Sequence, residues 1–305
     1  MEKITPTVVQ FIKLGEAGEW ERECLSNGTL RFGYHETPDN LCVEGRWEEV
    51  HDIWLNIRDM RKAVATSDVR QIKTFYTAGS ETVFITFWGG FLYWCLPSGP
   101  VDVLEDGSRL RKTVEGWKNT SIAGVQLTTD HLSGDLLKVQ GYRGTICNVS
   151  AQDYVIRKIN DQDLPAVSAA KKAEEAYLTA IKNLCQLLTW QDFELLIDLI
   201  FSTSGWRRTN IVGKTQKTLD LELELPTTSE KAFVQIKSRA NVDALREYEI
   251  VFRETTAYKR MFFIWHSGSL SESIKADGIT LIGPDKLAEL ILDSGLTRWL
   301  RKKVS

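Results

Sequence analysis

The chain has 305 residues and a formal net charge of −3, with 43% hydrophobic and 26% charged residues. This length predicts two domains, and no apolar run approaches the roughly 18–20 residues that a membrane-spanning helix needs. Five cysteines, an odd number without a Cys-x-x-Cys pair, argue against a disulfide framework or a structural zinc site. With no signal-peptide pattern at the N-terminus, they favour a cytoplasmic protein with reduced thiols.

The N-terminal half contains six of the ten tryptophans and several short β segments. Residues 82–88 and 91–96 are rich in β-branched and aromatic side chains and flank Gly89-Gly90, which predicts a β-hairpin. Turns are expected at Pro97-Ser98-Gly99-Pro100 and at 105–107, and apolar residues at helical spacing predict a helix over 48–62. The pattern indicates a β-rich α+β domain over 1–164.

A connecting helix is expected over 165–188, because residues 169–178 are strong helix formers and Pro165 suits a helix start. The remaining residues, 189–305, form the second predicted domain. Two basic runs, 109–112 and 301–303, are candidate nucleic-acid contacts or solvated faces.

The second domain begins with a helix and a hairpin. Thr189 and Asp192 resemble a capping box, and Glu194 lies near the start of the helix that they predict. Residues 219–225 alternate between leucine and acid, so a strand would place Asp220, Glu222 and Glu224 on one face. A second strand over 232–237 would place Gln235 and Lys237 together, beside these acids.

Such a set of side chains suits the hydrolysis of a phosphodiester. Oxygen ligands hold Mg²⁺, which lowers the pKa of bound water and neutralises charge that develops on the phosphate. A neighbouring lysine can orient the attacking water. The alternative interpretation is that three acids on an amphipathic strand form a solvated sheet face.

The order of these motifs resembles the Mrr-like branch of the PD-(D/E)xK nuclease superfamily. The resemblance rests on Asp-Phe-Glu-x-Leu at 192–196, an aspartate in a strand, and Val-Gln-Ile-Lys-Ser at 234–238. It extends to a core strand over 260–266, a closing helix over 287–292 and the segment 295–300. It implies an α/β fold with a mixed central sheet flanked by helices.

The resemblance also implies roles for single residues. Asp220 would be the principal metal ligand, and the Gln235 side chain with the backbone carbonyl of Ile236 would complete the metal shell. Lys237 would position the water, and Glu194 would be a supporting acid. Glu222 remains a second candidate ligand, and glutamine is a weaker ligand than a carboxylate.

Residues 83–149 resemble the EVE and related PUA-like small barrels, whose members read modified bases. That resemblance implies an aromatic pocket for a flipped base, with stacking worth ~1–3 kcal/mol per base. The candidates are Trp20, Trp88, Tyr93 and Trp117 for the pocket and Arg143 for a phosphate. The alternative is that these aromatic side chains belong to the core.

The sequence therefore predicts a modification-dependent restriction endonuclease that uses Mg²⁺, or Mn²⁺ in its place. Its substrate would be double-stranded DNA with methylated or hydroxymethylated cytosine, and no membrane would be involved. A homodimer is expected at least during cleavage, since two active sites are the simplest route to a double-strand break. Two alternatives stay open: an inactive nuclease fold that only binds nucleic acid, and a defence nuclease triggered by a small nucleotide or a partner.

Overall fold

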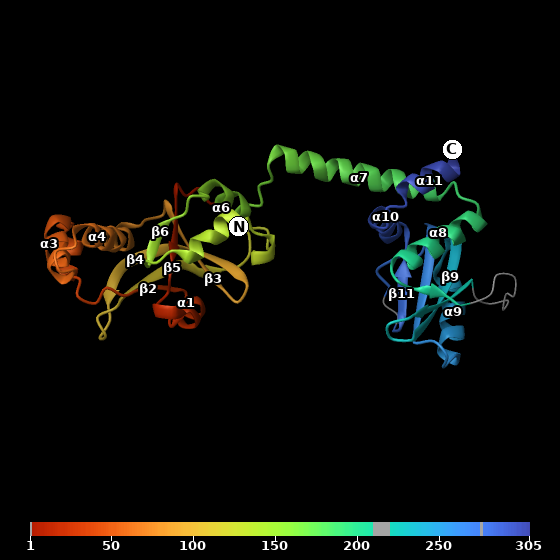
Figure 1. Cartoon of the computed structure of the whole chain (residues 1–305), viewed down its shortest axis with the longest axis horizontal. Helices are drawn as coiled ribbons and strands as arrows, with labels where there is room; N and C mark the ends of the chain where they lie inside the picture. The colour runs from red at the N-terminus through yellow and green to blue at the C-terminus, as the bar shows by residue number, and fades with distance from the viewer. Residues whose placement is uncertain (1, 210–219, 275–276) are drawn as a thin grey trace. The chain divides into compact units, whose positions relative to one another are not determined.

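The computed structural model describes residues 2–209, 220–274 and 277–305, which fall into two compact units, Met1–Leu164 and Pro165–Ser305 (Figure 1). Each unit is a mixed α/β structure built around one mixed sheet, so the coarse fold class is confirmed. Within the described ranges, no helix is both long and apolar enough to cross a membrane.

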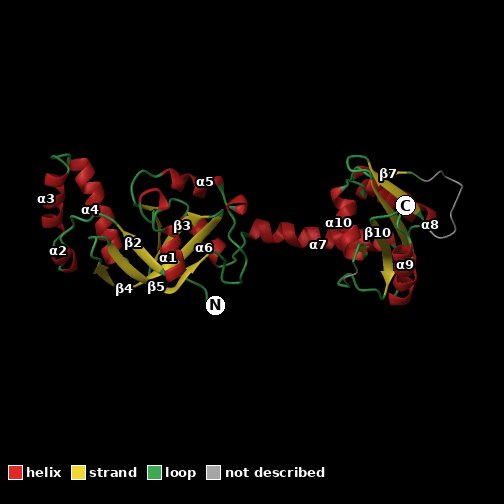
Figure 2. Ribbon diagram, turned by 90° about the horizontal axis from the view of Figure 1, so that it is seen from below, coloured by secondary structure: helices red, strands yellow, loops and turns green. Residues whose placement is uncertain are grey.

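The N-terminal unit has a six-stranded sheet in the order β2-β5-β4-β3-β1-β6, curled into a half-barrel. Its only parallel pair among the described strands joins β1 and β3. Helices α2, α3 and α4 gather beside one end of the sheet (Figure 2). The elements are β1 (Val8–Ile12), α1 (Glu21–Asn27), β2 (Thr29–Phe32), α2 (Asp39–Val43), α3 (Trp47–Ile57), α4 (Lys62–Thr77), β3 (Thr82–Trp88), β4 (Phe91–Val103), β5 (Arg109–Lys118), α5 (Gly134–Leu137), β6 (Ile146–Asn148) and α6 (Gln152–Ile159).

The predicted hairpin is confirmed as β3 and β4, which pair antiparallel. Gly89 and Gly90 connect them with φ of 59° and 84°, the left-handed conformations that a tight two-residue hairpin turn requires. The turn predicted at residues 97–100 is wrong. These residues lie inside β4, where the pairing register with β5 shifts between Ser98 and Asp102, so the proline and glycine mark a bulge.

The predicted helix over 48–62 is too long. Helix α3 ends at Ile57, because Asp59 and Met60 adopt positive φ values of 49° and 62°, which a helix does not contain. Helix α4, which the sequence analysis did not predict, begins at Lys62 and supplies Asp68 and Ile72 to the interior.

The sheet of this unit buries apolar side chains on both faces. Along β3, Phe84 packs with helices α1–α4 on one face, whereas Val83 and Ile85 pack with α6 on the other. This two-sided burial follows from the alternation of side chains along a strand.

The basic run 109–112 contains structural residues rather than a solvated face. Arg109 and Arg111 are 2% and 5% exposed. Arg109 donates to backbone carbonyls that include that of Tyr34 at 2.8 Å, and Arg111 donates to those of Phe75 and Ala78 at 2.8 and 3.0 Å. Both guanidinium groups therefore satisfy buried carbonyls.

The C-terminal unit has a five-stranded sheet in the order β11-β10-β9-β8-β7. Strands β9, β10 and β11 are parallel, and β7, β8 and β9 pair antiparallel. The elements are α7 (Pro165–Cys185), α8 (Trp190–Thr203), β7 (Arg207–Arg208), β8 (Leu221–Leu225), β9 (Glu230–Ala240), α9 (Val242–Glu254), β10 (Arg260–Gly268), β11 (Ile279–Ile282), α10 (Pro284–Asp293) and α11 (Thr297–Val304).

Helices cover both faces of this sheet. One face packs against α7, α8, α10 and α11 and includes Val234 and Ile264, while the other packs against α9 and includes Phe233 and Phe263. The expected helix cap is present, since the Thr189 hydroxyl accepts a hydrogen bond from the backbone N–H of Asp192 at 3.2 Å. Leu219, the first residue of the predicted strand, lies outside the described residues.

Candidate functional site

The hairpin of β8 and β9 sets the geometry of the predicted nuclease site. Leu221 and Leu223 are 1% exposed, as their alternation with acids predicts, and Leu221 pairs with Val234. This register places Asp220, which directly precedes β8, beside Gln235. The Asp220 Oδ2 atom accepts two hydrogen bonds, from Gln235 Nε2 at 2.5 Å and from the backbone N–H of Ile236 at 2.6 Å.

Lys237 follows on the same face of β9 as Gln235. Its Nζ atom lies 4.9 Å from the centre of the Tyr248 ring on α9, a cation–π contact that restricts where the ammonium group can go. Sequence reasoning missed Tyr248, because no local pattern relates a helix residue to a lysine on the preceding strand.

Two carboxyl groups of the site have pKa values above their ordinary range. Burial raises the pKa of Asp220, although the hydrogen bond from Ile236, the charge of Lys237 and the bond from Gln235 oppose that shift. Burial and then the charge of Asp220 raise the pKa of Glu194, against the charge of Arg208. The charge of Asp220 thus adds to burial in disfavouring ionisation of Glu194 on α8.

The oxygen atoms at this site fit a hard divalent cation. Gln235 is 2% exposed, and its Oε1 atom finds no hydrogen-bond partner within the described ranges, which is a costly arrangement for a buried acceptor. Carboxylate and amide oxygens such as these are ligands that Mg²⁺ prefers. Among the described residues, no group of three or more His, Cys, Asp or Glu side chains is arranged to hold a metal ion.

Glu222 has a different environment from Asp220. The hydroxyl group of Tyr258 donates a short hydrogen bond to Glu222 Oε1. Burial, followed by the bond to Glu222, raises the pKa of Tyr258 to about 12, so the phenol remains a donor at neutral pH. The Tyr258 hydroxyl thus already occupies one carboxylate oxygen of Glu222, the second candidate metal ligand.

His266 is a buried residue of β10, the strand that pairs with β9. It is 6% exposed, and neither ring nitrogen has a hydrogen-bond partner among the residues that the structure describes. Its ring packs edge-on against Phe193, the neighbour of Glu194, with centroids 4.7 Å apart. Burial lowers the pKa of His266, which keeps the ring neutral.

The five candidates of the N-terminal unit lie in different surroundings. Trp88 is 44% exposed, and its ring lies 6.4 Å from that of Tyr93 on the hairpin. Trp117 packs on the core, and its Nε1 atom donates to the carbonyl of Thr29 at 2.8 Å. Trp20 and Arg143 line a common cavity with a volume of about 620 Å³, and Trp88, Tyr93 and Trp117 are not among the residues that line it.

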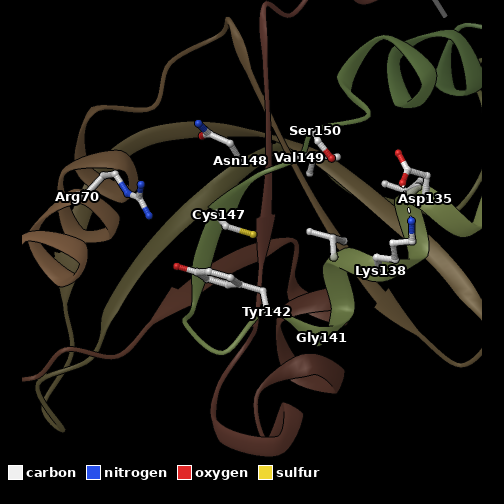
Figure 3. Close-up of a pocket in the computed structure, with 11 residues that line it drawn as sticks. Arg70, Asp135, Lys138, Gly141, Tyr142, Cys147, Asn148, Val149 and Ser150 are labelled. Atoms are coloured by element: carbon white, nitrogen blue, oxygen red, sulfur yellow. Dashed lines mark hydrogen bonds and ion pairs between the residues drawn. The ribbon is translucent and has the colours of Figure 1, made fainter. Parts of the chain in front are cut away.

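A second cavity of about 580 Å³ lies in the same unit, between α4 and the segment around β6. Figure 3 shows the Tyr142 ring next to the Cys147 thiol, with Arg70 on one side and the ion pair of Lys138 and Asp135 on the other. The Lys138 Nζ and Asp135 Oδ1 atoms are 3.0 Å apart. This cavity contains none of the predicted site residues.

Comparisons with protein-family models, curated proteins and solved structures found no match to this chain.

Proposed function

We propose that the C-terminal unit is a Mg²⁺-dependent endonuclease that hydrolyses DNA phosphodiester bonds. The observation that carries the proposal is the convergence of Asp220, Gln235 and Lys237 on one end of the β8–β9 hairpin. A buried carboxylate with a raised pKa, a buried amide oxygen and a nearby lysine form a set of perturbed groups typical of a catalytic centre.

Asp220, Gln235 and the carbonyl of Ile236 would hold Mg²⁺, or Mn²⁺ in its place. The bound cation would supply Lewis-acid polarisation of the phosphate and a more acidic water. Glu194 would accept a hydrogen bond from water at the edge of the site. Lys237, restrained by Tyr248, would direct its ammonium protons toward the attacking water and the phosphate oxygens.

The N-terminal unit would restrict which DNA is cut. Support comes from its cavity, which holds aromatic side chains beside Arg143, a combination suited to a base and its phosphate. We propose double-stranded DNA with methylated or hydroxymethylated cytosine as the target. The finer fold assignments, a PD-(D/E)xK nuclease and a PUA-like barrel, belong to this proposal, as does a homodimer during cleavage.

The test compares cleavage of matched DNAs that carry plain, 5-methylated or 5-hydroxymethylated cytosine in the presence of Mg²⁺. We expect cleavage of a modified substrate only, and a loss of at least about a hundredfold in Lys237→Ala. Arg239→Ala, an exposed basic residue two positions along β9, is the matched control and should cleave at the wild-type rate. Wild-type cleavage by Lys237→Ala would refute the site.

The same assay separates the two alternatives. DNA binding without cleavage under Mg²⁺ or Mn²⁺ would identify an inactive nuclease fold that serves only as a binding module. Cleavage of unmodified DNA that begins only on addition of a nucleotide would identify a triggered nuclease.

A further inference from the structure

The cavity that contains Trp20 is built from five separate segments of the N-terminal unit. Its aromatic wall consists of Trp20, Tyr34 and Trp54, and its polar wall includes Asp68 and Arg58. We call it the Asp68 cavity. Its volume of about 620 Å³ lies within the usual range of sites for small organic groups.

Asp68 is a buried carboxylate in the wall of this cavity, 6% exposed. Its Oδ1 atom accepts a hydrogen bond from the Tyr34 hydroxyl at 3.1 Å, and its Oδ2 atom accepts one from Arg58 Nε at 2.6 Å. Because each carboxylate oxygen can accept two hydrogen bonds, Asp68 retains capacity for another donor.

Arg58 occupies one acceptor of Asp68 and leaves the other with spare capacity. The guanidinium lies 5.1 Å from the centre of the Trp54 ring while it donates to Asp68 Oδ2, and its side chain is 35% exposed. The place between the indole and Oδ2 is therefore filled by the protein itself. A ligand would use the remaining acceptor capacity of the carboxylate.

Two residues of the wall have unfavourable backbone conformations. Tyr34 and Ala17 have φ of 60° and 51°, values that cost energy for residues other than glycine. Such conformations concentrate at ligand sites, where the surrounding structure enforces them. Both residues line the Asp68 cavity.

The charges of the lining favour an uncharged ring inside the cavity. Glu16, Glu19 and Glu36 lie along it together with Lys13, Arg143 and His35. Carboxylates would repel a buried phosphate, whereas the cations offer contacts for a phosphate outside the cavity. Lys13 already donates to the carbonyl of Tyr142, which leaves Arg143 as the residue best suited to that contact.

We infer that the Asp68 cavity binds a nucleobase with an exocyclic amino group, which donates a hydrogen bond to Asp68 while the ring lies against the aromatic wall. Cytosine and its 5-substituted forms carry this donor, whereas uracil and thymine carry a carbonyl oxygen at the same place. A carbonyl facing Asp68 would repel it. This inference rests on the proposed reading role of the N-terminal unit and names the residue that would select the base.

The test uses the full chain with Lys237→Ala, so that bound DNA remains intact. Fluorescein-labelled duplexes with one unpaired cytosine, 5-methylcytosine or uracil are titrated, and binding is followed by fluorescence anisotropy. We expect both cytosine duplexes to bind at least about tenfold more tightly than the uracil duplex, as a specific base contact implies. Equal affinity for cytosine and uracil would overturn the inference.

Two variants and a control locate the contact. Asp68→Asn should remove the preference for cytosine over uracil, and Trp20→Ala should weaken binding about fivefold or more through lost stacking. Trp20→Ala decides the result if Asp68→Asn does not fold. Trp88→Ala changes an exposed tryptophan of the same unit outside the cavity and should bind as wild type. Loss of the preference in Trp88→Ala alone would also refute the inference.

Free dCMP and dUMP distinguish the two sources of such a base. Displacement of DNA by dCMP but not by dUMP would identify a soluble nucleotide as the ligand, and no displacement by either would identify a base within DNA. A negative result in this binding test does not bear on the nuclease proposal. The anisotropy assay measures binding by the Lys237→Ala chain, which is not expected to cleave, whereas cleavage is measured separately with the wild-type chain.

Discussion

Gln235 and Asp220 face each other across the first residues of the β8–β9 hairpin, joined by a hydrogen bond of 2.5 Å from Nε2 to Oδ2. The amide thus donates to the carboxylate with one atom and leaves its buried oxygen without a partner in the described part of the chain. Rotation of the amide by half a turn would direct that oxygen toward a cation bound at Asp220. If the proposed metal binds, this rotation would exchange the hydrogen bond to Asp220 for a contact with the cation.

Gln235→Glu should destabilise the unit and increase its response to Mg²⁺. Without metal, two buried carboxylates would repel each other or share a proton, at a cost of about 3 kcal/mol in the free energy of unfolding near pH 8. Bound Mg²⁺ would neutralise them, so the melting temperature should rise more with Mg²⁺ than in wild type. Thermal unfolding with and without Mg²⁺ measures both effects.

The control for this prediction is Gln191→Glu, the same chemical change at an exposed position of α8. It should melt as wild type in either condition. An equal response to Mg²⁺ in wild type and Gln235→Glu would contradict the assignment of Gln235 to the metal shell.

Glu194→Gln should stabilise the protein at neutral pH while it lowers cleavage. The folded-state pKa of Glu194 lies above its ordinary value of 4.5, so the fold favours the neutral acid. The associated stability is complete below the unfolded pKa and is lost as the pH rises through the folded pKa. Glutamine stays neutral, so the variant should gain about 0.5 kcal/mol near pH 7, a small amount because Glu194 is half-buried.

Urea unfolding at a series of pH values checks this prediction. The difference in unfolding free energy between wild type and variant should vanish as the pH falls to about 4, because Glu194 is then largely protonated and as neutral as the glutamine that replaces it. A difference that is constant across the series would show that packing rather than charge separates the two proteins.

Asp220→Asn and Glu222→Gln should have unequal effects on cleavage. Asp220 lies beside Gln235, whereas Glu222 accepts a hydrogen bond from Tyr258. We therefore expect Asp220→Asn to lose about a hundredfold or more in cleavage rate and Glu222→Gln to stay within a few fold of wild type. Rates measured under saturating Mg²⁺ compare the two, and equal losses would give Glu222 a share of the metal.

Arg111→Met should destabilise the N-terminal unit by about 3 kcal/mol. The guanidinium donates to the carbonyls of Phe75 and Ala78 in a buried setting, and each buried acceptor left unpaired costs about 1–3 kcal/mol. Lys112→Met changes the exposed neighbour on the same strand and should leave stability unchanged. Urea unfolding measures both. A stable Arg111→Met with weakened DNA affinity would instead favour a surface role for this run.

The tertiary structure reveals relationships that local patterns do not contain. Tyr248 contacts Lys237 only because α9 folds back over the sheet after β9, and Tyr258 reaches Glu222 across 36 positions of the chain. The sequence also grouped Trp88 with Trp20 as pocket candidates, although Trp88 of the hairpin is not among the residues that line the cavity of Trp20. Aromatic composition predicts apolar contact but not which aromatic residues meet.

The sequence by itself determined the elements whose side-chain periodicity is strong. Alternating leucines and acids at 220–225 defined β8 and its buried face, and Gly89-Gly90 defined the β3–β4 turn, because both signals act over a few adjacent residues. Only the tertiary structure decided that Arg111 is buried, that Asp68 lines a cavity with Tyr34 and Trp54, and that Gln235 faces Asp220 with an unused oxygen. These properties depend on segments far apart in the chain, and their energies arise from desolvation and hydrogen bonding that exist only after the segments pack.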